Sequence, residues 1–279
     1  MDNLEFETLT AEELKIFMDT HREKSFLLID VRQPSEYEQG HIPGARLMPL
    51  AEVESRLFTL PSDRDLIFYC RNGGRSQWAA SLAGEGEVCE KTVYHLMNGI
   101  LGWKDKIQPG YPKVQVFDVD QSLTKLLETA MDLEKGARRF YRYVMDRYPE
   151  DPIRPILEQI AIAEKAHAKL IYHFWKKAQK EPPPFERLYR DLAGNILEGG
   201  QSFEEACRLL EAADNQGSPA VLDLAMTIEF SAFDLYRTMA EQTENAEAGS
   251  TFLSIAQAEK AHMRALTRGL KILSEHKSA

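Results

Sequence analysis

A five-residue segment that carries a carboxylate and an imidazole occurs twice in the second half of the chain. Ala163–His167 has the sequence AEKAH, and the same five residues return as Ala258–His262, 95 positions later. A further glutamate lies thirty residues before the glutamate of each copy. An internal repeat of this kind is a primary signal of architecture. It yields six candidate metal ligands: Glu134, Glu164, His167, Glu229, Glu259 and His262.

These six side chains have the chemistry of a dinuclear metal site. Each Glu-x-x-His pair lies on one helix face, because residues i and i+3 are neighbours there. Burial of four carboxylates without partners would cost free energy. Their summed negative charge is balanced by two divalent cations. Carboxylate and imidazole ligands suit iron or manganese, with zinc as a third candidate. One glutamate from each of two helices, with Glu-x-x-His from the other two, is the pattern of di-iron bundles. We therefore expect two iron ions.

A single AEKAH segment would be weaker evidence for a metal site, since such residues fill ordinary exposed helices. The duplication favours the metal site, because all six candidates lie within apolar stripes. Tyr141 and Tyr236 follow the lone glutamates by seven residues in the same stripes. They either hydrogen-bond the ligands or are core aromatic residues with satisfied hydroxyl groups.

A second reactive candidate is Cys70, which follows a buried strand and precedes a helix. Such positions bind ligands in parallel α/β sheets. The loop residues Arg71, Asn72, Gly73, Gly74 and Arg75 come next. Backbone N–H groups, the helix N-terminus and two arginines would stabilise a thiolate or bind an anion. Such a cysteine is either a sulfur carrier or a phosphatase nucleophile; a merely buried cysteine would not be expected beside these residues.

The elements around Cys70 predict an α/β domain over residues 1–115. Apolar runs at 27–31, 66–69 and 93–96 are typical of buried parallel strands. They alternate with helical segments, of which the first begins at a capping box, Thr10 to Glu13. Alternating strands and helices indicate a parallel sheet.

The remainder, residues 121–279, predicts an all-α four-helix bundle. Residues 108–112 break regular structure, so we expect the boundary at 113–121. The first long helix begins near Ser122, and the second is expected to have Asp151 as N-cap and Pro152 at its first position. Ser218 and Pro219 are expected to cap the third. The long connection between the second and third helices is typical of a ferritin-like bundle.

Composition restricts the classes of partner. The net charge of −10 disfavours nucleic acid and anionic membranes. No apolar run approaches the ~18 residues of a membrane span, and the N-terminus lacks a signal-peptide pattern. The three cysteines, Cys70, Cys89 and Cys207, show no Cys-x-x-Cys spacing, so neither a disulfide framework nor a zinc ribbon is indicated. We expect a cytoplasmic protein.

The first domain resembles the rhodanese family of sulfurtransferases over residues 5–113. The resemblance rests on Asp30-Val31-Arg32, on Gly40–Ala45, on the loop from Cys70 to Arg75, and on Gly99–Pro112. It implies that Cys70 accepts a sulfane sulfur as a persulfide and passes it to a thiol acceptor. The four residues between Cys70 and Arg75 match the short loop of sulfurtransferases, whereas related phosphatases have five.

The second domain resembles the rubrerythrin branch of the ferritin-like superfamily over residues 121–276. The resemblance rests on Glu134-Lys-Gly and Glu229, on both Glu-x-x-His pairs and on the two tyrosines. It implies a di-iron centre that reduces peroxide with an external electron donor. The sequence differs from the rubrerythrin pattern in two ways that bear on peroxide reduction. Ala232 replaces a glutamate that rubrerythrins often carry, and no cysteine follows Cys207 to form a rubredoxin-like tail.

Three functional hypotheses follow. In the first, a sulfurtransferase is fused to a di-iron oxidoreductase that acts on peroxide or oxygen. In the second, the bundle binds iron without turnover and the rhodanese-like domain senses or docks a partner. In the third, the bundle is empty and its glutamates are protonated. We also expect a homodimer, because ferritin-like domains often pair.

Overall fold

The computed structural model describes residues 6–117, 122–213 and 217–276, and its side chains to residue 274. It divides into two compact units, residues 1–111 and 112–279, each described below by itself. Residues 118–121, which belong to the expected boundary segment, lie outside the described part. Among the described residues, no helix has both the length and the apolar character needed to span a bilayer.

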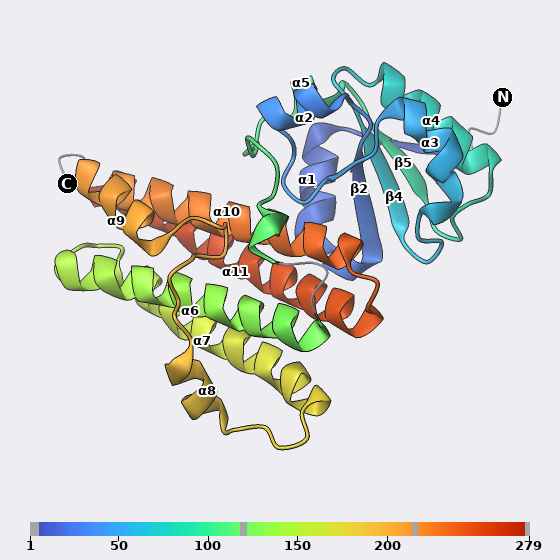
Figure 1. Cartoon of the computed structure of the whole chain (residues 1–279). Helices are drawn as coiled ribbons and strands as arrows, with labels where there is room; N and C mark the ends of the chain where they lie inside the picture. Colours follow the sequence, from blue (N-terminus) through green and yellow to red (C-terminus); the bar gives the residue numbers. More distant parts are fainter. Residues whose placement is uncertain (1–5, 118–121, 214–216, 277–279) are drawn as a thin grey trace. The chain divides into compact units, whose positions relative to one another are not determined.

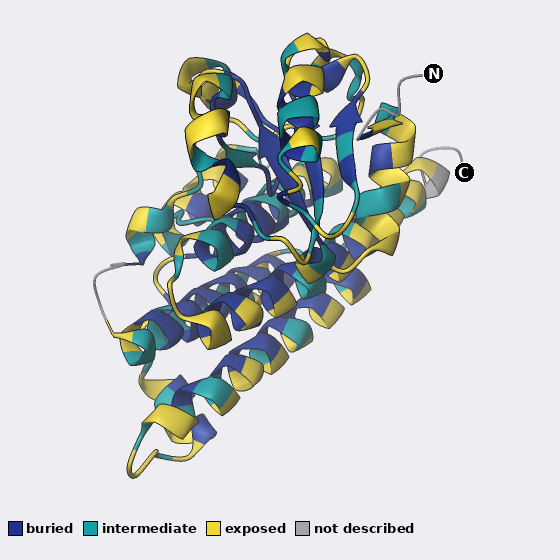
Figure 2. Cartoon of the chain, turned by 90° about the vertical axis from the view of Figure 1, so that its right-hand side faces the viewer, coloured by how far each residue is buried: buried dark blue, intermediate teal, exposed yellow. Residues whose placement is uncertain are grey.

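The first unit is built on a five-stranded parallel sheet with the order β1-β5-β4-β2-β3. The strands are β1 (Glu7–Leu9), β2 (Phe26–Asp30), β3 (Arg46–Leu47), β4 (Asp65–Tyr69) and β5 (Val93–Leu96). The helices are α1 (Ala11–Thr20), α2 (Pro34–Gln39), α3 (Leu50–Arg56), α4 (Gly74–Glu85) and α5 (Gly99–Gly102). The central strands β2 and β4 are buried almost throughout because both faces of the sheet are covered (Figure 2).

Alternate residues of β2 and β4 pack into two separate hydrophobic clusters. One cluster joins Leu27 and Phe68 to Val53 of α3 and to the alanines of α4. The other joins Leu28 and Ile67 to α1 and α2. The helices therefore cover both faces of the sheet, and the expected α/β class is confirmed. The expected capping box is also present, since the Thr10 hydroxyl oxygen accepts from the Glu13 N–H at 3.2 Å.

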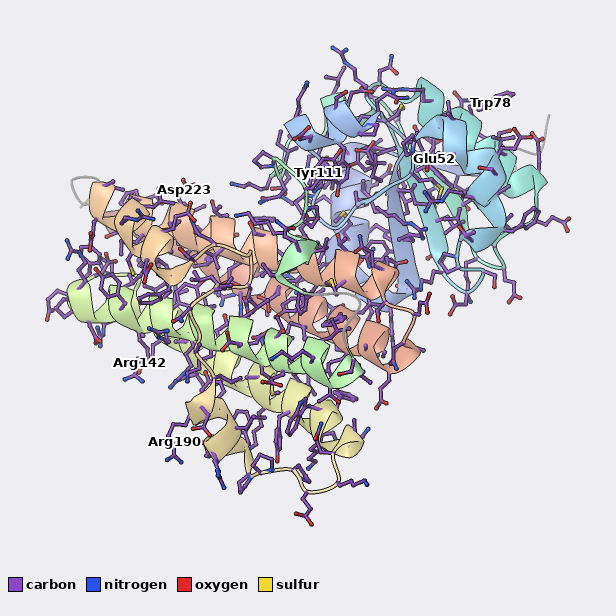
Figure 3. All side chains as sticks on the ribbon, in the orientation of Figure 1. Glu52, Trp78, Tyr111, Arg142, Arg190 and Asp223 are labelled. Atoms are coloured by element: carbon purple, nitrogen blue, oxygen red, sulfur yellow. The ribbon has the colours of Figure 1, made fainter. Side chains whose placement is uncertain are left out.

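The second unit has four long helices: α6 (Leu123–Arg147), α7 (Arg154–Trp175), α10 (Ser218–Gln242) and α11 (Ala246–His276). The crossover, defined as residues 176–217, joins α7 to α10 and contains α8 (Phe185–Asp191) and α9 (Phe203–Ala212) (Figure 1). This is the expected ferritin-like bundle. Exposed side chains such as Arg142 and Asp223 point away from the helices (Figure 3).

Two predicted helix starts were wrong by one or two residues. Helix α7 begins at Arg154 with Ile153 at the N-cap position, because Asp151 uses its Oδ1 to accept the Ile153 N–H at 3.0 Å and forms a local turn instead. Helix α10 begins at Ser218 after Gly217, so Ser218 lies inside the helix.

The bundle core consists of two apolar clusters separated by a polar layer, which contains the buried side chains of Glu134, Glu164, Glu229 and Glu259. Along α6, residues before Glu134 belong to one cluster and residues after it to the other. Helix α11 passes from one cluster to the other in the same sense around Glu259, whereas α7 and α10 pass in the reverse sense. Helices α6 and α11 are therefore parallel to each other and antiparallel to α7 and α10. Because α7 and α10 run the same way, the crossover must return along the length of the bundle.

Candidate functional site

The Cys70 loop forms a cradle of backbone N–H groups at the carboxyl end of β4. The Gly73 N–H donates to Cys70 Sγ at 3.2 Å, and Gly73 has a φ of 101°, which suits glycine. The backbone N–H groups of Ile100 and Leu101 in α5 donate to the carbonyl oxygens of Cys70 (2.8 Å) and Arg71 (3.1 Å). These bonds hold the loop carbonyls on α5 and leave N–H groups free to face the sulfur.

The cradle lowers the pKa of the Cys70 thiol. Burial acts in the other direction and raises this pKa, but hydrogen bonds from Ser76 and from the N–H groups of Gly73 and Asn72 outweigh it. The Ser76 hydroxyl also lies 3.0 Å from the Gly73 carbonyl oxygen. Cys70 is therefore a nucleophile candidate. In contrast, burial raises the pKa values of Cys89 and Cys207.

The two loop arginines differ in their availability to a ligand. Arg75 donates through both terminal nitrogens to Glu36, at 2.7 and 2.8 Å. This pair lowers the pKa of Glu36 to about 2. The Arg71 side chain is exposed, as are Asn72 and Gly74. Arg71 is thus the loop cation that faces solvent, whereas the guanidinium of Arg75 is held by Glu36.

In the bundle, the structure brings all six predicted ligand residues into the polar layer. The four glutamates are fully buried, and His167 and His262 are nearly so. His167 Nδ1 lies 3.2 Å from Glu134, 3.4 Å from Glu164 and 3.3 Å from Glu259. His262 Nδ1 lies 3.2 Å from Glu164, 2.9 Å from Glu229 and 3.1 Å from Glu259.

These distances divide the site into two halves with shared members. Of the two histidine Nδ1 atoms, Glu134 approaches that of His167 and Glu229 approaches that of His262, whereas Glu164 and Glu259 approach both. The two Glu-x-x-His glutamates are therefore the carboxylates that lie close to both histidines.

The donor atoms fit a pair of metal ions. Metal–ligand bonds of about 2.0–2.2 Å separate adjacent ligand atoms by about 3 Å, close to the distances above. Among the described residues, Glu134 Oε2, Glu259 Oε1 and both oxygens of Glu164 accept no hydrogen bond, although the nearby histidine nitrogens lie at ion-pair distance. Buried carboxylates are normally hydrogen-bonded, paired or coordinated to metal, so these free lone pairs are what a cation would use.

Two tyrosines link the repeats crosswise. Tyr141 of α6 donates to Glu229 of α10, and Tyr236 of α10 donates to Glu134 of α6 at 2.7 Å. Both hydroxyl groups are buried. The sequence left open whether these tyrosines contact the ligands, and the structure shows that they do.

The polar layer strongly perturbs the ionisation of its members. Burial raises the pKa of Glu164 well above its usual value and that of Glu229 to about 7. Burial alone would lower the pKa of His262, but Glu164, Glu259 and Glu229 raise it to about 12. Burial likewise opposes the shift of Glu259, whose pKa the two histidines lower. Metal binding must displace protons from such a site.

One member of the layer, Glu198, was not predicted from the sequence. It lies in the crossover and is fully buried. One oxygen of Glu198 and one from each of Glu134, Glu164 and Glu259 lie within 4.8 Å of one another. No helical stripe marks this residue, so periodicity could not identify it. The only local signal is a charged residue between a buried Leu197 and two glycines.

Comparison with known proteins agrees with both units. The model of the rhodanese-like domain matches residues 10–106. Relatives of this part include a sulfurtransferase of Allochromatium vinosum, 41% identical over 78 residues, which are 28% of this chain and 70% of that protein. The probable adenylyltransferase/sulfurtransferase MoeZ of Mycobacterium tuberculosis is 38% identical over 104 residues, 37% of this chain. The match spans only about a quarter (26%) of MoeZ.

A solved structure of a rhodanese-related protein from Thermoplasma volcanium is also similar. It is 21% identical with a TM-score of 0.33, and the match covers 37% of this chain and 98% of that one.

The rubrerythrin model matches residues 125–206 and 220–278, which hold all six predicted ligands. The chain therefore belongs to the rubrerythrin family through its helical bundle and carries an N-terminal rhodanese-like domain.

Proposed function

We propose that the protein is a sulfurtransferase fused to a di-iron oxidoreductase. The observation that carries the second half is the convergence of four buried glutamates and two histidines, with unpaired oxygens, in one layer of the bundle. The observation that carries the first half is the N–H cradle around a cysteine of lowered pKa.

In the sulfur-transfer step, the Cys70 thiolate attacks the outer sulfur of a sulfane donor such as thiosulfate. The donor S–S bond breaks, sulfite leaves with the electron pair, and Cys70 carries a persulfide. A thiolate acceptor then attacks the outer sulfur, and Cys70 leaves as the thiolate. The N–H groups of Asn72, Gly73 and Ser76 stabilise the anionic sulfur in both steps. Exposed Arg71 is placed to attract the anionic donor.

In the bundle, six residues would hold two iron ions. Glu134 and His167 lie on one side of the site, Glu229 and His262 lie on the other, and Glu164 and Glu259 are close to both histidines. Bound iron would supply electron transfer to peroxide or oxygen. The protein excludes bulk water from this layer, because the ligand residues are buried between two apolar clusters. Tyr141 fixes the orientation of the Glu229 carboxylate, and Tyr236 fixes that of Glu134.

Each half has its own test. Transfer of sulfur from thiosulfate to cyanide should be lost in Cys70→Ala and retained in Cys89→Ser. No transfer from any sulfane donor would refute the first half. Elemental analysis should give about two iron ions per chain, and these should be lost in a Glu164→Ala, Glu259→Ala variant.

Peroxide consumption by the reduced, iron-loaded protein separates the enzyme from its alternative. Sustained consumption with an added electron donor supports the oxidoreductase. A single oxidation without turnover, whatever the donor, would instead support an iron-binding bundle beside a sensing or docking rhodanese-like domain. Five features stay predictions: the sulfur donor, the thiol acceptor, the external electron donor, the homodimer and the cytoplasmic location.

A further inference from the structure

Glu198 is a fully buried carboxylate of the bundle that the proposed site does not use. Its side chain is fully buried, and neither of its oxygens accepts a hydrogen bond from any described residue. It approaches Glu134, Glu164 and Glu259, the same three carboxylates that surround His167. A buried carboxylate in this state requires a partner, and none is provided by the described protein atoms.

The path of the crossover explains how Glu198 reaches the polar layer. The crossover returns along the bundle, and its earlier residues Phe185 and Tyr189 pack in the apolar cluster on one side of the layer. Leu197 and Leu210 pack in the cluster on the other side. The chain therefore passes the level of the four ligand glutamates close to residue 198.

Helix α6 holds this part of the crossover through a set of specific contacts. Lys135 Nζ donates to three carbonyl oxygens at the end of α8, at 2.6–2.9 Å. Arg139 donates to the carbonyl oxygens of Ala193 (2.7 Å) and Gly194 (2.6 Å). The Gly194 N–H donates to Asp132 at 2.8 Å. These contacts come from the outer face of α6, next to the turn that carries Glu134.

Two glycines allow the crossover to lie directly on the helices. A Cβ on Gly136 would lie 2.0 Å from the Ile196 carbonyl oxygen, and a Cβ on Gly199 would lie 2.5 Å from Ser231 Cβ in α10. The segment around Glu198 is thus held tightly against both α6 and α10. Such support is what a metal ligand needs, since its position must be fixed within a fraction of an ångström.

We propose that Glu198 is a seventh protein ligand of the dinuclear centre and binds the ion on the His167 side. This inference rests on the proposed metal site. The His167-side ion would have donors from Glu134, Glu164, Glu259, His167 and Glu198, whereas the His262-side ion would have donors from Glu229, Glu164, Glu259 and His262.

The fifth carboxylate makes the two metal positions unequal. The other six ligands are related by the repeat, but Glu198 has no counterpart, because the residue 95 positions earlier is Trp103 of the other unit. An additional anionic donor strengthens binding of a hard cation. The His167-side position should therefore bind its ion more tightly than the His262-side position.

The test uses the full chain, freed of metal and titrated anaerobically with Co(II), with calorimetry and visible absorption as readouts. The wild type should bind about two equivalents with unequal affinity. Glu198→Gln preserves the size of the side chain, and it should weaken one equivalent by about tenfold or more. The absorption of that ion should change, because its ligand set has changed. The control is Glu204→Gln, which removes an exposed carboxylate of the same crossover and should leave both affinities unchanged.

Far-UV circular dichroism and thermal unfolding of the metal-free proteins establish that the variants fold. If Glu198→Gln does not fold, Glu198→Asp, which shortens the side chain by one methylene, should show the same selective weakening. Two equivalents with wild-type affinities and spectra in a folded variant would overturn the role of Glu198 and leave the dinuclear site intact. A wild type that binds no Co(II) or ferrous iron would instead overturn the proposed function itself.

Discussion

Removal of the two crosswise tyrosine hydroxyls tests whether the repeats hold each other's ligands in place. In Tyr141→Phe, Glu229 loses its donor from α6, and in Tyr236→Phe, Glu134 loses its donor from α10. Neither change alters the size of the core appreciably, because only one oxygen is removed. The effect should therefore appear in metal binding more strongly than in folding.

The structure sets the size of the effect. Both hydroxyls are fully buried, and each donates to a carboxylate, so each bond is worth about 1.5–3 kcal/mol. Partners that orient metal ligands typically change affinity about 10–100-fold, which is about 1.4–2.7 kcal/mol. Each single variant should weaken mainly one ion: the His262-side ion in Tyr141→Phe and the His167-side ion in Tyr236→Phe.

The assay is competition for Co(II) against a chelator, with Tyr143→Phe as the matched control. The hydroxyl of Tyr143 donates to Glu211 at 2.8 Å in an exposed position, so its removal should change affinity less than about twofold. Wild-type affinity in both buried variants, or equal losses in all three, would refute the reasoning. Loss of the same ion in both buried variants would show that the crosswise assignment is wrong.

Three further predictions concern other parts of the chain. Ser76→Ala should raise the pKa of Cys70, because it removes the hydrogen bond from the Ser76 hydroxyl to the thiolate, and the pH midpoint of iodoacetamide alkylation should move upward; an unchanged midpoint would show that this hydroxyl does not stabilise the thiolate. The Glu36–Arg75 pair contributes stability that is present above the ordinary carboxyl pKa of 4.5 and is lost as pH falls toward about 2. Glu36→Gln should remove about 1 kcal/mol of this acid-sensitive stability, after allowance for partial exposure, in urea unfolding at pH 6; a variant as stable as the wild type at pH 6 would exclude the pair as the cause. Gly136→Ala should destabilise the bundle by about 1–3 kcal/mol in urea unfolding, although alanine normally favours a helix by about 1 kcal/mol, because its Cβ would strike the crossover backbone; a gain in stability would mean that the crossover is not held there.

The regular parts of both units could be predicted from the sequence because hydrophobic periodicity determines them. The strands that contain Ile29, Phe68 and His95 and the four long helices are continuous apolar runs or stripes. The short elements β1, β3, α2, α3 and α8 were not predicted. Strands of two or three residues, such as Arg46–Leu47, have too few positions to show alternation, and they form because a neighbouring strand supplies the pairing.

The site shows the same division between local and non-local information. Glu134, Glu164 and their repeat partners could be identified because the duplication and the helical stripe are both local signals. Arg75 was predicted to bind an anion, but the structure shows that Glu36, 39 residues away in sequence, already holds its guanidinium. Glu198 could not be identified, because its burial depends on contacts of the crossover with α6 and α10 that no sequence period records.

The two units treat buried charge in opposite ways, and this contrast indicates which kind of ligand each one takes. Around Cys70, the protein provides donors for an anion in its own backbone, so a thiolate is stabilised there. In the bundle, the protein provides acceptors, and the oxygens of Glu164 and Glu198 have no donors among the described residues. A site that supplies donors can stabilise an anionic sulfur by itself, whereas buried carboxylate oxygens that lack donors are satisfied by cations. The stability of the bundle should therefore depend on metal far more than the stability of the rhodanese-like domain does.

Chelation should lower the unfolding temperature of the bundle and leave that of the N-terminal unit unchanged. A single transition that does not respond to chelator would show that the glutamates are satisfied by protons instead.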